Sequence, residues 1–255
     1  MSPSAPNGHE KREFASEIKF LVDPATAERV RAWARDNLER DPNAREDTYG
    51  VTSLYYDTTD FTVFRREGHH RHSKFRIRRY DGATLFLERK LKVAGRVAKH
   101  RTRISPAELD QLIRPFMPAW PGKWFENKTA ARRLRPVCQI DYLRTARVLA
   151  TPAGPIRLTL DENLRALAVH DPRFHDAAHA KSLTDRVVLE LKFRRDLPLL
   201  FRTLAADFGL NPQPFSKYRA AVQALQLAPT TDRSPAPARP AATLLAPNIV
   251  ACPTS

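Results

Sequence analysis

The sequence has little cysteine, little glycine and no long apolar run. Its two cysteines, Cys138 and Cys252, are too few for a disulfide framework, which is typical of a reducing compartment. No apolar stretch approaches the roughly 20 residues of a membrane-spanning helix, and the N-terminus lacks the apolar core of a signal peptide. We therefore expect a soluble, cytoplasmic protein. With eight glycines and no glycine-rich phosphate loop, side chains must hold any bound phosphate.

Acidic residues are also scarce relative to basic ones. The chain of 255 residues has 43 Lys and Arg but only 28 Asp and Glu, which gives a formal net charge of +15. This excess predicts attraction to polyanions, which include nucleic acid, anionic lipid, nucleotides and condensed phosphates. We expect a flexible N-terminus over residues 1–11 and a disordered Ala/Pro-rich tail over residues 228–255. One domain over residues 12–227 then carries nearly all of the positive charge.

Eight segments alternate between apolar and polar residues with a period of two, which predicts strands. They are residues 14–21, 50–57, 73–80, 84–91, 96–104, 137–149, 154–162 and 186–194. An Asp-Gly pair at 81–82 predicts a hairpin between the third and fourth segments. Capping residues, prolines and one glycine predict helices that begin near residues 24, 106, 198 and 215, the second of them reaching about residue 116. The stretch 118–134 stays unassigned, and the fold class is α+β.

Many charged residues of these strands share one parity. Lys74, Arg76 and Arg78 lie on one face of their strand, and Phe75 and Ile77 lie on the other. The same parity groups Lys19, Lys90, Lys99, Arg101, Arg103, Arg157 and Lys192, against Glu17, Glu88, Asp161 and Glu190. A solvent-exposed face is the ordinary explanation for one strand, but such faces usually mix the signs. So many like charges repel one another unless an anion lies among them, which favours an antiparallel, eight-stranded, tunnel-like β-barrel with a basic interior and helices outside.

Short motifs in a fixed order then point to a family. They are SEIKF (16–20), SLYYDT (53–58), KFRIRRYD (74–81), LERK (87–90), AKHRTRI (98–104), DYLRTA (141–146), IRLTLD (156–161), VLELKF (188–193) and FSKYRAA (215–221). With them the chain resembles the VTC domain, the polyphosphate polymerase branch of the triphosphate tunnel metalloenzymes, which are related to the CYTH family. The resemblance covers residues 12 to about 225 and implies a tunnel of antiparallel strands with basic residues pointing inward.

The resemblance also implies roles for individual residues, and strand parity adds others. Together they assign catalysis to Lys19, Arg76, Arg78, Lys90 and Lys192. Binding of the substrate phosphates is assigned to Lys74, Lys99, Arg101, Arg103, Arg144, Arg157 and Lys217. The metal ligand is expected to be Glu190, assisted by Glu17 or Glu88, with Mn²⁺ or Mg²⁺ as the cofactor.

The expected function is a metal-dependent polyphosphate polymerase that moves the terminal phosphoryl group of ATP onto a growing polyphosphate chain. One departure from the family concerns Ala15, which stands where relatives that hydrolyse triphosphates carry the first glutamate of a Glu-x-Glu-x-Lys motif. The alternatives are a triphosphatase, which this departure disfavours, and a non-catalytic module that binds polyphosphate or nucleotides. A general nucleic-acid binder is disfavoured because exposed aromatic residues do not alternate with the basic ones. Any membrane or regulatory partner must be another chain.

Overall fold

The computed structural model describes residues 16–42, 44, 46–81, 84–93, 96–114 and 116–229. The strands are β1 (Ser16–Val22), β2 (Glu39–Arg40), β3 (Thr48–Asp57), β4 (Ser73–Tyr80), β5 (Thr84–Val93), β6 (Arg96–Ile104), β7 (Arg135–Leu149), β8 (Ile156–Ala168), β9 (Lys181–Ser182) and β10 (Val187–Phe193). The α-helices are α1 (Pro24–Asn37), α2 (Thr62–Arg65), α3 (Pro106–Leu109), α4 (Lys123–Ala131), α5 (Leu199–Asp207) and α6 (Lys217–Ala224). The predicted N-terminal segment at 1–11 and the predicted tail at 228–255, apart from residues 228 and 229, lie outside the described residues, as do Ala15 and Gly82.

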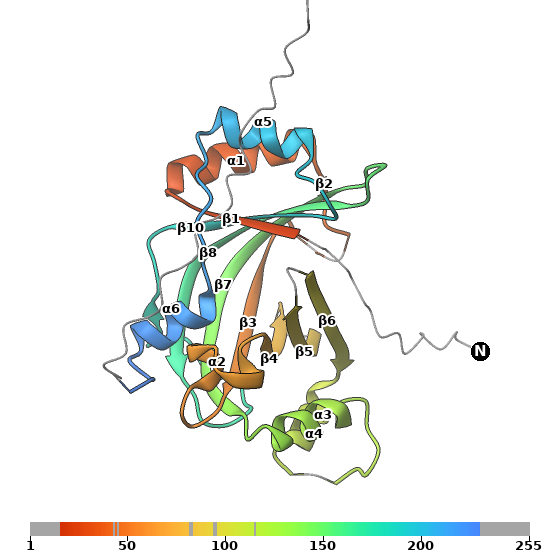
Figure 1. Cartoon of the computed structure of the whole chain (residues 1–255), viewed down its shortest axis with the longest axis vertical. Coiled ribbons are helices and arrows are strands. Elements are labelled where there is room, and N and C mark those ends of the chain that lie inside the picture. The colour runs from red at the N-terminus through yellow and green to blue at the C-terminus, as the bar shows by residue number, and fades with distance from the viewer. Residues whose placement is uncertain are drawn as a thin grey trace, which may run out of the picture.

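The strands form one antiparallel sheet, as predicted. Its path runs β1-β10-β8-β7-β3-β4-β5-β6, while β2 pairs with β7 and β9 pairs with β8. The eight long strands are the eight predicted ones, and the α+β class is confirmed. The sheet curves strongly, so that the backbone of β1 and β10 lies opposite that of β4, β5 and β6 on the concave side (Figure 1).

The prediction of a closed barrel is wrong for the described strands. β1 and β6 end the path, and no backbone ladder joins them in the part of the chain that the structure describes. A side-chain contact crosses the concave side instead, where the Lys90 ammonium on β5 lies 3.0 Å from the Glu17 carboxylate on β1. Long charged side chains fill this space and connect the two halves, so the two edges do not reach hydrogen-bonding distance.

The convex face of the sheet is apolar and carries helices. Phe20, Leu158 and Leu189 pack with residues of α1 and α5 in one core cluster, and Figure 1 shows these two helices stacked above β1 and β10. Asp23 caps α1 by accepting a hydrogen bond from the Thr26 amide at 2.8 Å. A second cluster unites the apolar face of β3, β4 and β5 with α4. Helices α1, α4 and α5 thus cover the outside of the sheet and leave the charged side chains on its concave side.

Two helical predictions need correction. The capping box of Ser105 and Glu108 is present, but α3 ends at Leu109, continues as a 3₁₀ turn over Asp110–Leu112 and does not reach Phe116. The Gln111 side chain bonds the Met117 main chain through both its amide and its carbonyl group and turns the chain away. The unassigned stretch 118–134 contains α4. Among the described helices, none is long and apolar enough to cross a membrane.

Candidate functional site

The structure gathers the basic residues singled out by strand parity on the concave side of the sheet, called the inner face from here on. Cross-strand pairs put Lys19 opposite Glu190, Lys192 opposite Arg157, and Glu88 opposite both Arg76 and Arg101, so their side chains leave the sheet on one side. The inner face carries Glu17, Lys19, Lys74, Arg76, Arg78, Glu88, Lys90, Lys99, Arg101, Arg103, Arg144, Arg157, Asp161, Glu190 and Lys192, and α6 adds Lys217. Every predicted site residue therefore belongs to one surface.

Glu88 is the centre of one cluster on this face. Its side chain is 1% exposed and lies 2.6 Å from the Arg76 guanidinium, 2.6 Å from the Lys99 ammonium and 3.3 Å from Arg101 Nε. Burial alone would raise the pKa of Glu88, but Arg76 and Lys99 hold it well below its usual value. The carboxylate is thus ionised and holds three cations together.

A second cluster joins β1 and β10. The Lys19 ammonium lies 3.5 Å from one Glu17 oxygen and 3.4 Å from one Glu190 oxygen, so two carboxylates share one cation. Lys192 lies 2.7 Å from the other oxygen of Glu190. Burial would raise the pKa of Glu190, but Lys192 and Lys19 hold it well below its usual value. The pKa of Glu17 is also lowered, because the attraction of Lys19 and Lys90 outweighs burial and the repulsion of Glu190.

Asp161 on β8 is the third anionic centre. Arg144 donates two hydrogen bonds to it, at 2.6 and 2.7 Å, and Lys217 of α6 donates a third at 2.6 Å. These cations lower the pKa of Asp161 against the effect of complete burial. Arg157 has its own carboxylate, Asp41, at 2.6 Å. Sequence reasoning missed Asp41 because it follows a strand of two residues, too short to show any alternation.

Three inner-face cations have no carboxylate within ion-pair distance in the part of the chain that the structure describes. Arg78, 4% exposed, donates to the Ser53 hydroxyl at 2.9 Å. Lys74 donates to the Ser216 hydroxyl at 3.0 Å, and Arg103 is exposed at the end of β6. Burial and the nearby Lys19 and Lys90 lower the pKa of Lys74 to about 8. Uncompensated buried cations are costly, and an anion with several oxygens would stabilise them.

The inner face offers carboxylate oxygens for a divalent cation at one place. No group of three or more His, Cys, Asp and Glu side chains converges within the described residues. Glu17 and Glu190 nevertheless lie close enough to share Lys19, and Mg²⁺ is commonly held by one or two carboxylates together with substrate phosphates. Glu88 bonds a different set of cations. Glu17 and Glu190 therefore fit a divalent cation that also binds a phosphate chain.

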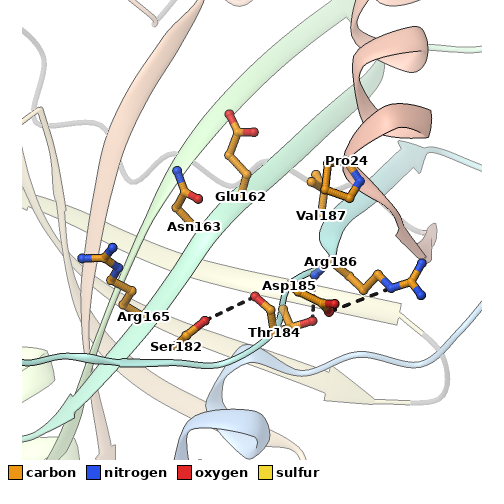
Figure 2. A pocket seen from close by; sticks show the side chains of 9 residues that line it. All are labelled: Pro24, Glu162, Asn163, Arg165, Ser182, Thr184, Asp185, Arg186 and Val187. Atoms are coloured by element: carbon orange, nitrogen blue, oxygen red, sulfur yellow. Dashed lines mark hydrogen bonds and ion pairs between the residues drawn. The ribbon is translucent and has the colours of Figure 1, made fainter.

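One cavity of the molecule lies away from the predicted site, and none of the predicted site residues lines it. This cavity of about 300 Å³ lies at the start of α1 and beside β9, and the side chains that line it are drawn in Figure 2. Its lining is Pro24, Glu162, Asn163, Arg165, Ser182, Thr184, Asp185, Arg186 and Val187. The lining mixes both charges with hydroxyl groups and shares no residue with the inner face.

Comparison with known proteins gives similar folds and one family. The structure is similar to that of a "putative adenylate cyclase" from Bacillus halodurans, with 14% identity and a TM-score of 0.52 over 80% of this chain and 93% of that one. It is also similar to a protein from Pyrococcus horikoshii OT3 (13% identity, TM-score 0.45, 82% and 96% covered) and to an inorganic triphosphatase (14%, 0.27, 82% and 96%). A search of curated proteins found no significant match. The family model of the VTC domain matches residues 14–226, and the chain therefore belongs to the VTC domain family.

Proposed function

We propose that the protein is a polyphosphate polymerase that transfers the terminal phosphoryl group of ATP to a growing polyphosphate chain. One observation carries the proposal: each inner-face carboxylate is bonded to at least two cations, and its pKa is lowered. Hydrolysis of a triphosphate is assisted by a group that accepts a proton from water, and carboxylate oxygens that already bond cations are poorly available for this. The terminal oxygen of a phosphate chain is already ionised and needs no base.

The transfer itself is a displacement at phosphorus. A terminal oxygen of the chain attacks the γ-phosphorus of ATP, the bond to the β,γ-bridging oxygen breaks, and ADP leaves with that oxygen. The chain grows by one phosphate and no proton moves. The catalysis required is positioning and charge stabilisation, which inner-face cations provide.

We assign the cations around the transferred group to Lys19, Arg76, Arg78, Lys90 and Lys192. Arginine forks contact two phosphate oxygens at once, and lysines act as compact charges. The other inner-face cations, Lys74, Lys99, Arg101, Arg103, Arg144, Arg157 and Lys217, would hold the rest of the chain. Asp161 and Asp41 hold Arg144 and Arg157 in place until phosphate binds.

The proposed cofactor is Mn²⁺ or Mg²⁺. Glu190 and Glu17 would hold it, and when bound it would neutralise charge that develops on the phosphate oxygens. Glu88, the other predicted ligand, is assigned here to the ordering of Arg76, Lys99 and Arg101. The substrates ATP and polyphosphate are both available in the cytoplasm, where we expect the protein to act.

Incubation with ATP and Mn²⁺ tests the proposal directly. Gel electrophoresis of the products should show long phosphate chains, and ADP should accumulate in proportion. An Arg78→Ala protein under the same conditions serves as the inactive control. If free phosphate forms without chains, the proposal is wrong and the protein is a triphosphatase. If ATP and polyphosphate bind but no product forms, the protein is a binding module.

A further inference from the structure

A pair of arginines lies on the convex side of the sheet, behind the inner face. Arg89 comes from β5, and Arg132 follows directly after α4. Their guanidinium carbons lie 5.6 and 5.9 Å from the centre of the same ring, that of Phe75. Two guanidinium groups that contact one buried ring are held near each other on the outer surface.

The polar partners of this pair are neutral. Arg89 donates from Nε to the Ser73 hydroxyl at 3.0 Å, and Arg132 donates from Nη1 to the Lys128 carbonyl at 3.4 Å. Arg132 Nε is buried and has no hydrogen-bond partner among the residues that the structure describes. Across the described chain, neither guanidinium has a carboxylate within ion-pair distance. Burial and the charge of Arg132 lower the pKa of Arg89, so the repulsion between the two is not offset.

Capping of the C-terminus of α4 explains the position of Arg132 but not that of Arg89. A cation at the C-terminus of a helix interacts favourably with the last carbonyl groups, and Arg132 makes such a contact. Arg89 makes no contact of this kind, and it is the residue whose charged form is disfavoured. Its cross-strand neighbour His100 stacks on Trp124 of α4, with the two ring centres 3.9 Å apart.

We propose that Arg89 and Arg132 form a second phosphate-binding site, outside the inner face, for a distal part of the polyphosphate chain. The inference rests on the proposed function. Each guanidinium presents several N–H donors in a plane, and two of them close together suit the oxygens of one or two phosphate groups.

The strands themselves connect the two sites. Lys90 and Lys99 are cross-strand neighbours on the inner face. Arg89 and His100 are the next cross-strand pair along β5 and β6, and their side chains point outward. β6 ends the sheet, so a chain that leaves the inner face beside Lys99 passes over a single strand before it reaches the outer pair.

Nucleic acid is a poorer occupant of the outer site. Bases bind to such surfaces by stacking on exposed aromatic rings. Phe75 is 1% exposed, and His100 already stacks on Trp124. The local chemistry favours an anion of phosphate groups alone, without bases.

Binding of two ligands to the full chain tests this site. Tripolyphosphate should bind the inner face only, whereas a long polyphosphate chain should reach both sites. The double variant Arg89→Ala/Arg132→Ala should bind long polyphosphate about tenfold more weakly, as expected for the loss of charge-assisted contacts, and tripolyphosphate unchanged. The matched control is Arg186→Ala/Arg202→Ala, which removes the same charge from exposed positions elsewhere and should leave both affinities nearly unchanged.

The outcomes distinguish a failure of the outer site from a failure of the proposed function. An equal loss for both ligands, or a loss as large in the control, would overturn the outer site and leave the inner face in place. A loss of single-stranded DNA binding without a loss of polyphosphate binding would assign the pair to nucleic acid and also overturn it. If the Arg78→Ala protein binds tripolyphosphate like the unmodified protein, it is the inner face, and with it the proposed function, that fails.

Discussion

Arg78 and Arg76 are neighbours on one strand face, yet they differ in what holds them. Arg76 is tied to the buried Glu88, so its removal also leaves a carboxylate with fewer partners. Arg78 bonds the Ser53 hydroxyl and lies between the rings of Tyr80 and Tyr142. At the residue scale, Arg78 is therefore the cleaner probe of phosphate binding.

We expect Arg78→Ala to weaken tripolyphosphate binding by about tenfold to a hundredfold, since charge-assisted hydrogen bonds contribute roughly 1.5–3 kcal/mol. Isothermal titration calorimetry measures this. The control is Arg79→Ala, which removes the same charge from the opposite face of β4, where Arg79 stacks on Phe174 at 4.4 Å. Equal affinities for the two variants would contradict the assignment of Arg78 to the phosphate site.

Glu88→Gln should have opposite effects on stability and on binding. Loss of this buried charge removes the carboxylate that pairs with Arg76 and Lys99 and should destabilise the free protein by about 3 kcal/mol or more. The same carboxylate competes with phosphate for those cations, so tripolyphosphate should bind the variant more tightly without metal. Chemical unfolding and calorimetry give the two quantities. Weaker binding only when Mn²⁺ is present would instead make Glu88 a metal ligand.

Two lysines predict how binding depends on pH. Burial lowers the pKa of Lys74 and of Lys99 to about 8, with further effects of neighbouring cations. Both are charged below that pH, and bound phosphate stabilises the charged form. Affinity for tripolyphosphate should therefore be full near neutral pH and should fall as the pH rises through 8. Lys74→Met should bind more weakly at neutral pH and lose part of this fall, and a flat profile for the unmodified protein would contradict the prediction.

At the scale of elements, α6 closes one end of the inner face and depends on Asp57. This fully buried carboxylate accepts hydrogen bonds from the amides of Val63 and Phe64 and from the Tyr218 hydroxyl. The Tyr218 ring stacks on Tyr55 at 5.3 Å, and the Tyr55 hydroxyl accepts from Arg76. The packing of α6 is thus connected to a predicted catalytic side chain.

Tyr218→Phe keeps the stacked ring and removes one donor from Asp57. Unfolding in urea should show a loss of about 1–3 kcal/mol, the usual cost of a buried polar group that loses a partner. Tyr142→Phe is the matched control, because the Tyr142 hydroxyl is buried without a hydrogen-bond partner, so its removal should cost little. A similar loss in both variants would show that the bond to Asp57 contributes nothing of its own.

The strands were predictable because charged or polar residues alternate with apolar ones along each strand, as Lys74, Phe75 and Arg76 do. The end of the helix that was expected to reach Phe116 was not predictable. The Gln111 side chain forms hydrogen bonds with the main chain of Met117, and such a contact has no signal in the local pattern. α4 was missed because Trp120, Trp124 and its basic residues follow no single apolar stripe. Local patterns thus gave the elements and the inner face, whereas the pairing partner of each cation depends on contacts between distant segments.

Whether the sheet closes depends on the whole molecule, and no local sequence pattern predicts it. Alternation shows that a face is charged, but not whether its two edges meet in a backbone ladder. The distance between them depends on the long side chains inside, such as Lys90 and Glu17, which connect β5 to β1. The predicted barrel is therefore an open, curved sheet with the expected interior.

The net charge of +15 leads to a prediction about the whole molecule. Inner-face cations outnumber the carboxylates there, so the free protein carries a repulsion that a mobile anion can relieve. Added chloride should raise its melting temperature slightly by screening. Sulfate at the same ionic strength should raise it more, and tripolyphosphate should act at far lower concentrations because it binds the folded state specifically.

Differential scanning fluorimetry with matched ionic strength distinguishes these effects. Glu88→Gln should show the largest stabilisation by tripolyphosphate, since it has the greatest excess of cations, and Arg78→Ala should show the smallest. Screening alone would make the three anions equivalent at equal ionic strength and would give both variants the same response as the unmodified protein. That result would mean that the positive charge is distributed over the surface rather than concentrated on the inner face, because only cations that converge can distinguish a phosphate chain from simple salt.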